Sequence, residues 1–385
     1  MVGSANMKIK ILIVDDSRIF RSAVAESLAA VADIEVVGSV WNGAKAIEFI
    51  RSHPPHLVTL DVEMPDMDGI ETLAAIQKIN ADNKDSRPVG VIMLSSHTRE
   101  GADITIKALE MGAFDFIQKP EGKNLKESFE ILRRQLVTKI RHFAAEGFPA
   151  IFAKPLSAPG PLPAALSWSP VDSRIRGILI GVSTGGPRAL AEMLPPLCEK
   201  TDVPIFIVQH MPPTFTQSLA KSLNTKCRYT VIEGIHQDRV RERHVYIAPG
   251  GRHMLLAKKR NEIVTVVNDQ PPVNGCRPSV DILFISGATV YGQDTVAVIL
   301  TGMGADGTEG ARILKRTGAV IIAQDEATSV VWGMPGSACE SGNVDHVLPL
   351  GDIPAALAGI MRQSILSAEN DKARQGALYG ARLPA

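Results

Sequence analysis

Three polar residues in the second half of the chain have the side chains of a nucleophilic hydrolase. Ser183 and His210 directly follow the apolar runs RGILIGV and VPIFIVQ, and Asp306 closely follows TVAVIL. Because the carboxyl ends of parallel strands meet at one edge of a sheet, we expect these side chains to lie together there. A serine, an imidazole base and a carboxylate that orients the base form a Ser-His-Asp relay.

Asp306 and Ser183 also have alternative interpretations. In LTGMGADG (300–307), an aspartate among glycines is often a helix N-cap or a turn residue. Ser183 fits the G-x-S-x-G elbow; the rival is a phosphate-binding loop, but the P-loop lysine and the G-x-G-x-x-G pattern are missing. The glycines around Asp306 would leave backbone N–H groups free to bind an oxyanion.

Other titratable residues fit the relay less well. Of the nine histidines, only His210 and His97 closely follow a predicted buried strand, and His97 belongs to the first half of the chain. Asp281 follows Ser279 in the predicted first turn of a helix, and Asp269 lies in a proline-rich loop. Asp306 is therefore the expected third member.

In the first half, five polar residues stand at the ends of predicted strands: Asp15, Asp16, Asp61, Ser95 and Lys119. Any one of them could be a helix cap or a turn residue, but all five at strand ends indicate a site. Three carboxylates brought together need a cation, and Mg²⁺ suits hard oxygen ligands. Asp61 would be the nucleophile toward a phosphoryl donor, with Lys119 neutralising the phosphoryl oxygens and Ser95 binding the new group.

Apolar strands alternate with helical patterns in both halves, which predicts an α/β fold with two doubly wound parallel sheets. The second resembles a Rossmann-like domain with a hairpin insertion. We expect one domain over 7–125, a helix and a linker with six prolines over 126–174, a second domain over 175–365 and a polar tail over 366–385.

Composition narrows the function classes. Forty-one basic residues balance forty-one acidic ones, which argues against a nucleic-acid partner. No apolar run is long enough to insert in a membrane, and no secretory signal is visible, so we expect a cytoplasmic protein. The four cysteines form no CxxC pair, which favours small buried residues over a zinc or disulfide framework.

The motifs LIVDDS, TLDVEMPDMDG, IMLSS and QKP resemble those of response-regulator receiver domains and span most of the first domain. The resemblance implies Asp61 as the phospho-acceptor and Asp16 as a direct ligand of Mg²⁺. It also implies Asp15 as a ligand through water and the backbone carbonyl of Glu63 as a further ligand. Phe116 falls at the position of a switch aromatic.

The motifs IGVSTGG, VQHMPP, YIAPGGRHM, PPVNGCRPSVD and ILTGMGADG resemble the catalytic domain of chemotaxis receptor methylesterases, which share the chain order Ser, His, Asp. The resemblance implies cofactor-free hydrolysis of methylated glutamates on chemoreceptor cytoplasmic helices, deamidation of glutamines, and a chemotaxis histidine kinase as phosphodonor. Backbone N–H groups near Thr184 and Met303 would stabilise the oxyanion.

Three other functions compete with this interpretation. A DNA-binding response regulator would need a basic recognition helix after the linker, and none is visible. A nucleotide-binding oxidoreductase would need the glycine fingerprint. A phosphorylation-dependent binding module without catalysis remains the alternative, although the intact triad argues against it.

Overall fold

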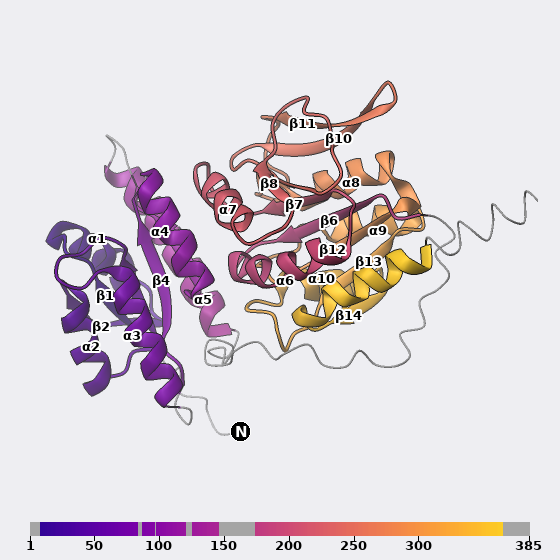
Figure 1. Ribbon diagram of the computed structural model, residues 1–385. Coiled ribbons are helices and arrows are strands. Elements are labelled where there is room, and N and C mark those ends of the chain that lie inside the picture. Colours follow the sequence, from indigo (N-terminus) through magenta and orange to yellow (C-terminus); the bar gives the residue numbers. More distant parts are fainter. Residues whose placement is uncertain (1–7, 84–86, 97, 121–124, 146–173, 365–385) are drawn as a thin grey trace, which may run out of the picture. The chain divides into compact units, whose positions relative to one another are not determined.

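The computed structural model describes residues 8–83, 87–96, 98–120, 125–145 and 174–364 (Figure 1). The chain divides into two units with a boundary between residues 156 and 157. This boundary falls within the predicted proline-rich linker. The linker and the predicted C-terminal tail lie outside the described residues, so the expected domain boundaries stay predictions.

The first unit contains a five-stranded parallel sheet with the order β2-β1-β3-β4-β5. Its strands are β1 (Ile9–Val14), β2 (Ile34–Val40), β3 (Leu57–Asp61), β4 (Gly90–Ser95) and β5 (Asp115–Gln118). Its helices are α1 (Arg18–Ala29), α2 (Gly43–Ser52), α3 (Gly69–Asp82), α4 (Arg99–Glu110) and α5 (Leu125–Ala145). The strand order reverses between β1 and β3, where doubly wound sheets bind their ligands.

Helix α5 packs on this sheet, as its amphipathic pattern predicts. Its buried side chains are Leu132, Leu136, Ile140 and Phe143, which share one face at helical spacing. The Phe143 ring meets the Phe114 ring edge-on at 5.1 Å between centroids. A Cβ on Gly90 would lie 2.4 Å from the Phe143 ring, so glycine is needed where the helix crosses β4.

The second unit contains a seven-stranded parallel sheet with the order β14-β13-β12-β6-β7-β9-β8. Its strands are β6 (Gly177–Val182), β7 (Ile205–Gln209), β8 (Thr230–Glu233), β9 (His244–Ile247), β12 (Thr295–Ile299), β13 (Val320–Gln324) and β14 (His346–Leu348). Its main helices are α6 (Gly186–Lys200), α7 (Phe215–Asn224), α8 (Val280–Val290), α9 (Thr308–Arg316) and α10 (Gly333–Glu340).

An antiparallel hairpin is inserted between β9 and α8. It consists of β10 (His253–Lys259) and β11 (Glu262–Asn268), joined by a two-residue turn in which Arg260 has a φ of 57°. The hairpin lies against α8 (Figure 1), and Leu256 N–H donates to Ser286 Oγ at 3.0 Å. The predicted fold class, with two doubly wound sheets and a hairpin insertion, is confirmed.

The order of the second sheet also reverses once. From β6 the chain continues to β7, β8 and β9 on one side, and it returns to β12 on the other side of β6. All six residues of β6 are buried because neighbouring strands and helices cover this central strand completely. The crevice beyond the carboxyl ends of β6 and β12 is thus the expected ligand position in this unit.

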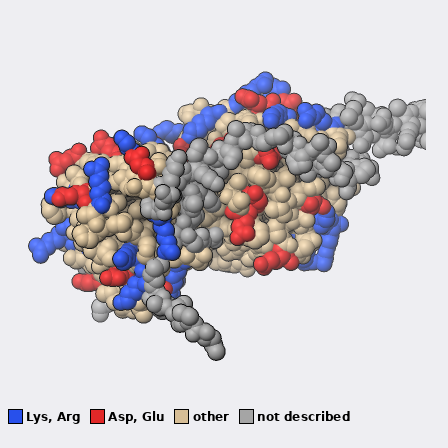
Figure 2. All heavy atoms as spheres, turned by 90° about the horizontal axis from the view of Figure 1, so that it is seen from below, with Lys and Arg blue, Asp and Glu red and all other residues tan. Residues whose placement is uncertain are grey.

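No helix in the described ranges is long and apolar enough to cross a bilayer. On the face shown in Figure 2, basic and acidic side chains are interspersed, and neither sign forms a continuous patch.

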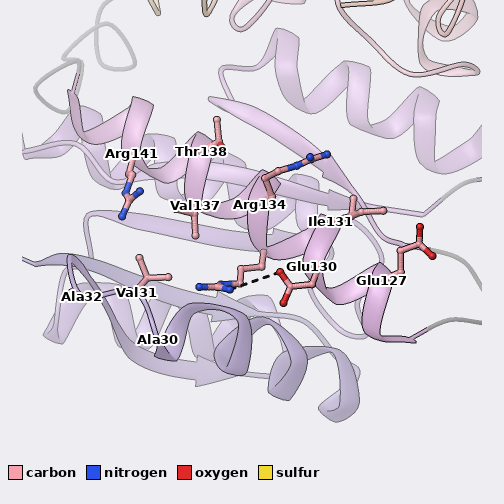
Figure 3. Close-up of a pocket in the computed structure, with 11 residues that line it drawn as sticks. Ala30, Val31, Ala32, Glu127, Glu130, Ile131, Arg134, Val137, Thr138 and Arg141 are labelled. Carbon is pink, nitrogen blue, oxygen red and sulfur yellow. Dashed lines mark ion pairs between the residues drawn. The ribbon is translucent and has the colours of Figure 1, made fainter. Parts of the chain in front are cut away.

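A cavity of about 840 Å³ lies between the end of α1 and helix α5 in the first unit (Figure 3). Two of the arginines that line it are already paired: Arg133 with Glu130 at 3.8 Å, and Arg141 with Asp33 at 2.9 Å. None of the predicted site residues lines this cavity. We therefore assign it no part in the chemistry.

A tight contact between β6 and α8 gives a test of the packing. A Cβ on Gly181 would lie 2.3 Å from Val280 Cγ1. We expect Gly181→Ala to lower the free energy of unfolding by roughly 1–3 kcal/mol through overpacking, as measured by urea denaturation.

The matched control is Val280→Ala, which removes the colliding methyl groups. In the double variant the loss should be smaller than the sum of the two single losses. Strict additivity of the two losses would contradict the packing at this contact.

Candidate active site

Ser183 and His210 lie side by side because of strand register. Val182, the last residue of β6, pairs with Gln209, the last residue of β7, so the next residue of each strand is also adjacent. His210 N–H donates to Val182 O at 3.2 Å, and Gln209 Nε2 donates to Ser183 O at 2.9 Å. The predicted neighbourhood of serine and histidine is therefore present.

The turn that carries Ser183 is held by the strand on its other side. Ser183 N–H donates to Thr301 O at 3.0 Å, and Thr301 Oγ donates to Thr184 O at 2.9 Å. Gly185, the N-cap residue of α6, adopts a φ of 80°, which gives the sharp strand-to-helix reversal of an elbow. A Cβ on Gly302 would lie 2.7 Å from Ser183 Cβ, so only glycine permits this approach.

Asp306 completes the group from the loop after β12. Its Oδ2 lies 2.8 Å from His210 Nε2, and the residue is 3% exposed. Three further donors come from the start of α8: Ser279 Oγ at 2.8 Å, Val280 N–H at 2.7 Å and Asp281 N–H at 3.1 Å. Asp306 is thus fully hydrogen-bonded while it orients the imidazole.

Asp281 makes the complementary contact in the opposite direction. Its Oδ1 accepts hydrogen bonds from Gly307 N–H at 3.0 Å and Gly310 N–H at 2.7 Å, at the start of α9. Each helix therefore presents its N-terminal N–H groups to a carboxylate from the other segment, where the helix dipole favours negative charge. We call this pair of contacts, made by Asp281 and Asp306, the reciprocal cap.

The surroundings shift the pKa values of these groups. Burial opposes ionisation of Asp306, but hydrogen bonds from His210 and from the start of α8 keep its pKa below the usual range. Burial, together with the Asp306 charge, raises the pKa of Asp281 to about 6. Burial also opposes the charge of His210, yet hydrogen bonds with Asp306 and Cys276 raise its pKa to about 9.

The second imidazole nitrogen, Nδ1, points away from Asp306. Cys276 Sγ lies 4.0 Å from it, at the rim of the site. Because Nε2 is bonded to Asp306, Nδ1 is the nitrogen that remains for exchange of a proton with a neighbouring group. Met303 follows Gly302, where an added Cβ would lie 2.7 Å from Ser183 Cβ, and Thr184 directly follows Ser183, so both residues are close to Ser183 along the chain.

Sequence reasoning missed three residues that support this site. Ser279, Asp281 and Thr301 bind the predicted site residues directly. The sequence predicts Asp281 in a helix first turn; it is in the first turn of α8, and it is also half of the reciprocal cap. The sequence signal for Ser279 and Asp281 is the S-V-D pattern of a helix start, which does not reveal that these residues contact Asp306 and the start of α9.

The acidic residues of the first unit also converge. Carboxylate oxygens of Asp15, Asp16 and Asp61 lie within 4.8 Å of one another, at the ends of β1 and β3. Lys119 Nζ lies 2.8 Å from both Asp15 and Asp61 and 4.8 Å from the centroid of the Phe20 ring. The lysine thus neutralises part of this negative charge.

The remaining negative charge fits a divalent cation. Burial and the nearby Asp15 raise the pKa of Asp61 to about 6, because two close carboxylates disfavour each other's ionisation. Burial opposes the charge of Lys119, but hydrogen bonds with the two carboxylates raise its pKa. Asp16 and Glu63 line the same hollow of about 520 Å³. Hard oxygen donors around such a hollow suit Mg²⁺.

Ser95 and Phe116 are buried near this cluster. Ser95, at the end of β4, accepts a hydrogen bond from Thr105 Oγ at 2.7 Å, and its own hydroxyl faces Gly101 O of α4 at 3.3 Å. In this arrangement Ser95 bonds to α4 rather than to Asp61. Phe116, on β5, is 7% exposed. Both residues must change contacts if they are to respond to Asp61.

Comparison with known proteins identifies the family. Residues 178–357 match the family model described as CheB methylesterase, and residues 11–130 match the response regulator receiver domain. The protein-glutamate methylesterase/protein-glutamine glutaminase 3 of Burkholderia lata is 42% identical over 91% of this chain and 95% of its own length. The chain belongs to the CheB methylesterase family.

Relatives of this family occur in distant organisms. The protein-glutamate methylesterase/protein-glutamine glutaminase of Pyrococcus horikoshii is 40% identical over 90% of this chain and 92% of its own length. Among solved structures, the Thermotoga maritima CheB methylesterase catalytic domain is 42% identical. The match covers 48% of this chain and 98% of the solved domain, with a TM-score of 0.46.

The raised pKa of His210 predicts how stability depends on pH. A group whose pKa is about 9 in the folded chain and 6.5 otherwise stabilises the fold fully below about pH 6.5. This contribution, on the order of 3 kcal/mol, should be lost as the pH rises through about 9. Urea unfolding at about pH 6 and about pH 10 measures the change in the free energy of unfolding, and NMR titration of the imidazole measures the pKa of His210.

Asp306→Asn serves as the comparison, because it removes the charge that favours the imidazolium. In this variant the pKa of His210 should fall toward its usual range, and the pH-dependent loss of stability should shrink. An unchanged imidazole titration in Asp306→Asn would show that Asp306 does not set this pKa.

Proposed function

We propose that this chain is a serine hydrolase that demethylates glutamate methyl esters on the cytoplasmic helices of chemoreceptors, under control of its receiver domain. It is a carboxylic ester hydrolase of the protein-glutamate methylesterase/protein-glutamine glutaminase family. One observation carries the catalytic assignment: the 2.8 Å bond between His210 Nε2 and Asp306, next to Ser183.

The first half-reaction transfers the glutamyl group to the enzyme. Ser183 Oγ attacks the ester carbonyl while His210 Nδ1 takes the hydroxyl proton. Asp306 stabilises the imidazolium that results. Backbone N–H groups near Thr184 and Met303 receive the negative charge of the tetrahedral intermediate. When this intermediate collapses, the imidazolium gives its proton to the methoxide, and methanol leaves.

The second half-reaction restores the enzyme. Water, deprotonated by His210, attacks the glutamyl ester of Ser183, and the proton returns to the serine oxygen. The products are a free glutamate carboxylate and the original enzyme. A glutamine amide follows the same two steps with ammonia as the first product, which accounts for glutaminase activity. None of these steps uses a cofactor.

The raised pKa of His210 has two opposing effects on the rate of catalysis. Asp306 makes the neutral imidazole a stronger base, which speeds removal of the serine proton. The same interaction raises the pKa to about 9, so a smaller fraction of molecules carries the neutral ring at neutral pH. Activity should therefore increase as the pH approaches the pKa of His210.

Asp61 is the proposed phospho-acceptor of the receiver domain. Asp15, Asp16 and Asp61 supply carboxylates for Mg²⁺, and the Glu63 carbonyl is the further proposed ligand. When bound, Mg²⁺ neutralises charge on the incoming phosphoryl group. Lys119, already 2.8 Å from the Asp61 carboxylate, provides a second positive charge. The phosphodonor would be a chemotaxis histidine kinase.

Phosphorylation would be transmitted through α4. A phosphoryl group adds about −1.5 to −2 charge and three strong acceptor oxygens. To donate to it, the Ser95 hydroxyl must leave Gly101 O of α4, while Thr105 Oγ also contacts Gly101 O at 2.6 Å. Phe116 would adjust in the space that this movement opens. The changed receiver surface would relieve the proposed inhibition of the hydrolase.

The non-catalytic alternative is not favoured. A binding module would have no need for a buried carboxylate fully hydrogen-bonded beside an imidazole. Such a carboxylate costs several kcal/mol to bury unless its contacts compensate for lost water. Here the contacts hold the orientation that general-base catalysis requires.

Substitutions in the triad test catalysis. Ser183→Ala and His210→Ala should each reduce methanol release from methylated receptor membranes by roughly 10⁴-fold or more, with little further loss in the double variant. Asp306→Asn should be severe but milder, because nucleophile and base remain.

Circular dichroism and unfolding of each variant provide the control for intact folding. A Ser183→Ala variant with more than about a tenth of wild-type activity would show that the nucleophile lies elsewhere, since loss of a true nucleophile costs far more.

A second experiment tests regulation. A small phosphodonor with Mg²⁺ should raise methylesterase activity of the wild type, and Asp61→Asn should abolish this rise while it keeps the basal rate. Deletion of residues 1–145 should give a catalytic domain more active than the unphosphorylated full chain. Equal rates for these two proteins would mean that the receiver does not inhibit.

A further inference from the structure

We propose that Zn²⁺ binds between the Cys276 thiolate and His210 Nδ1 and thereby inhibits the hydrolase. The inhibition rests on the proposed function, in which Nδ1 takes the proton of Ser183, whereas binding of the ion does not. The ion acts as an inhibitor and is not a cofactor of the reaction.

The two ligand atoms stand at nearly the separation that zinc requires. Cys276 Sγ lies 4.0 Å from His210 Nδ1. In a tetrahedral site, bonds of about 2.3 Å to sulfur and about 2.0–2.1 Å to nitrogen place these two atoms roughly 3.6 Å apart. A side-chain movement of a few tenths of an ångström is therefore sufficient. Both residues are partly exposed, so a hydrated ion can reach them.

The bond between His210 and Asp306 prepares the imidazole for a metal. Nε2 lies 2.8 Å from Asp306 Oδ2, so the proton of the neutral ring stays on Nε2 and the lone pair stays on Nδ1. Histidine ligands of metals commonly donate their other N–H to a carboxylate in this way. The arrangement that makes Nδ1 a base thus also makes it a ligand.

Asp306 supports this site from the far side of the ring and is not itself a ligand. One of its carboxylate oxygens lies within 4.8 Å of ligand atoms of Cys276 and His210. Its two oxygens, however, already accept hydrogen bonds from His210, Ser279 and the first N–H groups of α8. Two protein ligands therefore hold the ion, and water fills its remaining positions.

A tight turn holds Cys276 in place. Val273 and Cys276 exchange two backbone hydrogen bonds, of 3.1 and 2.8 Å. Between them, Asn274 has a φ of 52° and Gly275 a φ of 77°. Positive φ at both central positions is the geometry of a type I′ turn, which Asn-Gly favours. Asn274 Nδ2 also donates to Asp281 Oδ2 at 3.1 Å, so the turn that presents the thiol is tied to the reciprocal cap.

The donor atoms favour zinc over magnesium. Thiolate sulfur and imidazole nitrogen suit Zn²⁺, whereas carboxylate oxygens suit Mg²⁺. In the described part of the chain, the other converging group of potential metal ligands consists of Asp15, Asp16 and Asp61 in the receiver, which offers oxygen alone. We therefore expect the two ions at different units of the chain.

Binding releases protons and removes the base. Cys276 gives its thiol proton to solvent, and a charged imidazole gives up the proton on Nδ1, because metals bind the deprotonated ligands. Although burial opposes the charge of His210, hydrogen bonds raise its pKa to about 9, so zinc competes with a proton at neutral pH. General-base catalysis contributes roughly 10²–10⁴-fold, so saturating Zn²⁺ should lower methanol release by roughly 10²-fold or more.

The experiment uses the full chain at about pH 8, where competition from the proton is weaker, with excess Mg²⁺ present throughout. Co²⁺, a spectroscopic substitute for Zn²⁺, should give the charge-transfer absorption of a cobalt–thiolate bond. Zn²⁺ should remove this band and lower methanol release. Cys276→Ala should lose the band and most of the zinc inhibition, each measured against the same variant without metal. The matched variant Cys339→Ala on α10 should retain both.

The wild type provides a test that needs no variant. Bound Zn²⁺ should protect Cys276 from iodoacetamide, as mapped by mass spectrometry, whereas alkylation of Cys339 should not change. A cobalt–thiolate band that persists in Cys276→Ala, equal zinc inhibition of this variant and the wild type, or unchanged alkylation of Cys276 would overturn the proposal. A chain that releases no methanol in the absence of zinc would refute the proposed function instead, and the cobalt band would still test the metal site.

Discussion

The reciprocal cap of α8 and α9 is the contact on which the catalytic unit depends. Asp306 and Asp281 are both buried, and each accepts backbone N–H groups at the start of the opposite helix. Burial of a carboxylate without partners costs several kcal/mol, so these bonds must be present before the loop can stay in place. The position of the His210 ring then follows from the position of Asp306.

This constraint links stability to chemistry. The N–H groups that keep Asp306 ionised also fix the distance and direction of its bond to His210. Movement of α8 relative to α9 would therefore disturb the base as well as the fold. The glycine at 302 has a similar double role, because its missing side chain allows the loop after β12 to touch Ser183.

The receiver site carries excess negative charge, whereas the buried carboxylates of the catalytic unit are compensated. In the catalytic unit, helix N-termini and an imidazole compensate the buried carboxylates, whereas in the first unit the described residues bring three carboxylates together and Lys119 pairs with two of them. The excess negative charge raises the pKa of Asp61 and favours a divalent cation. Both sites stand where the strand order of their sheet reverses, because neighbouring strands there send their connections to opposite sides and leave a crevice.

The sequence alone was sufficient for the two parallel sheets, the hairpin, the family and the residues at the strand ends, because each of these leaves a local pattern. Alternation of apolar runs with helical segments defines the sheets, and Ser183 and His210 directly follow such runs. Asp306 was open to two interpretations, a helix cap or a triad member. In the structure Asp306 accepts N–H groups at the start of α8 and binds His210, and its role in the triad is a proposal.

Only the tertiary structure decided which partners these residues have. Ser279 donates to a carboxylate 27 positions away, and Asp281 accepts N–H groups from the start of α9. Ser95 faces α4 instead of Asp61, which no strand pattern reveals. Local propensity depends on neighbouring residues, whereas hydrogen bonds and pKa values depend on groups that the fold brings together from distant segments. The chemistry of this protein is set by those distant contacts.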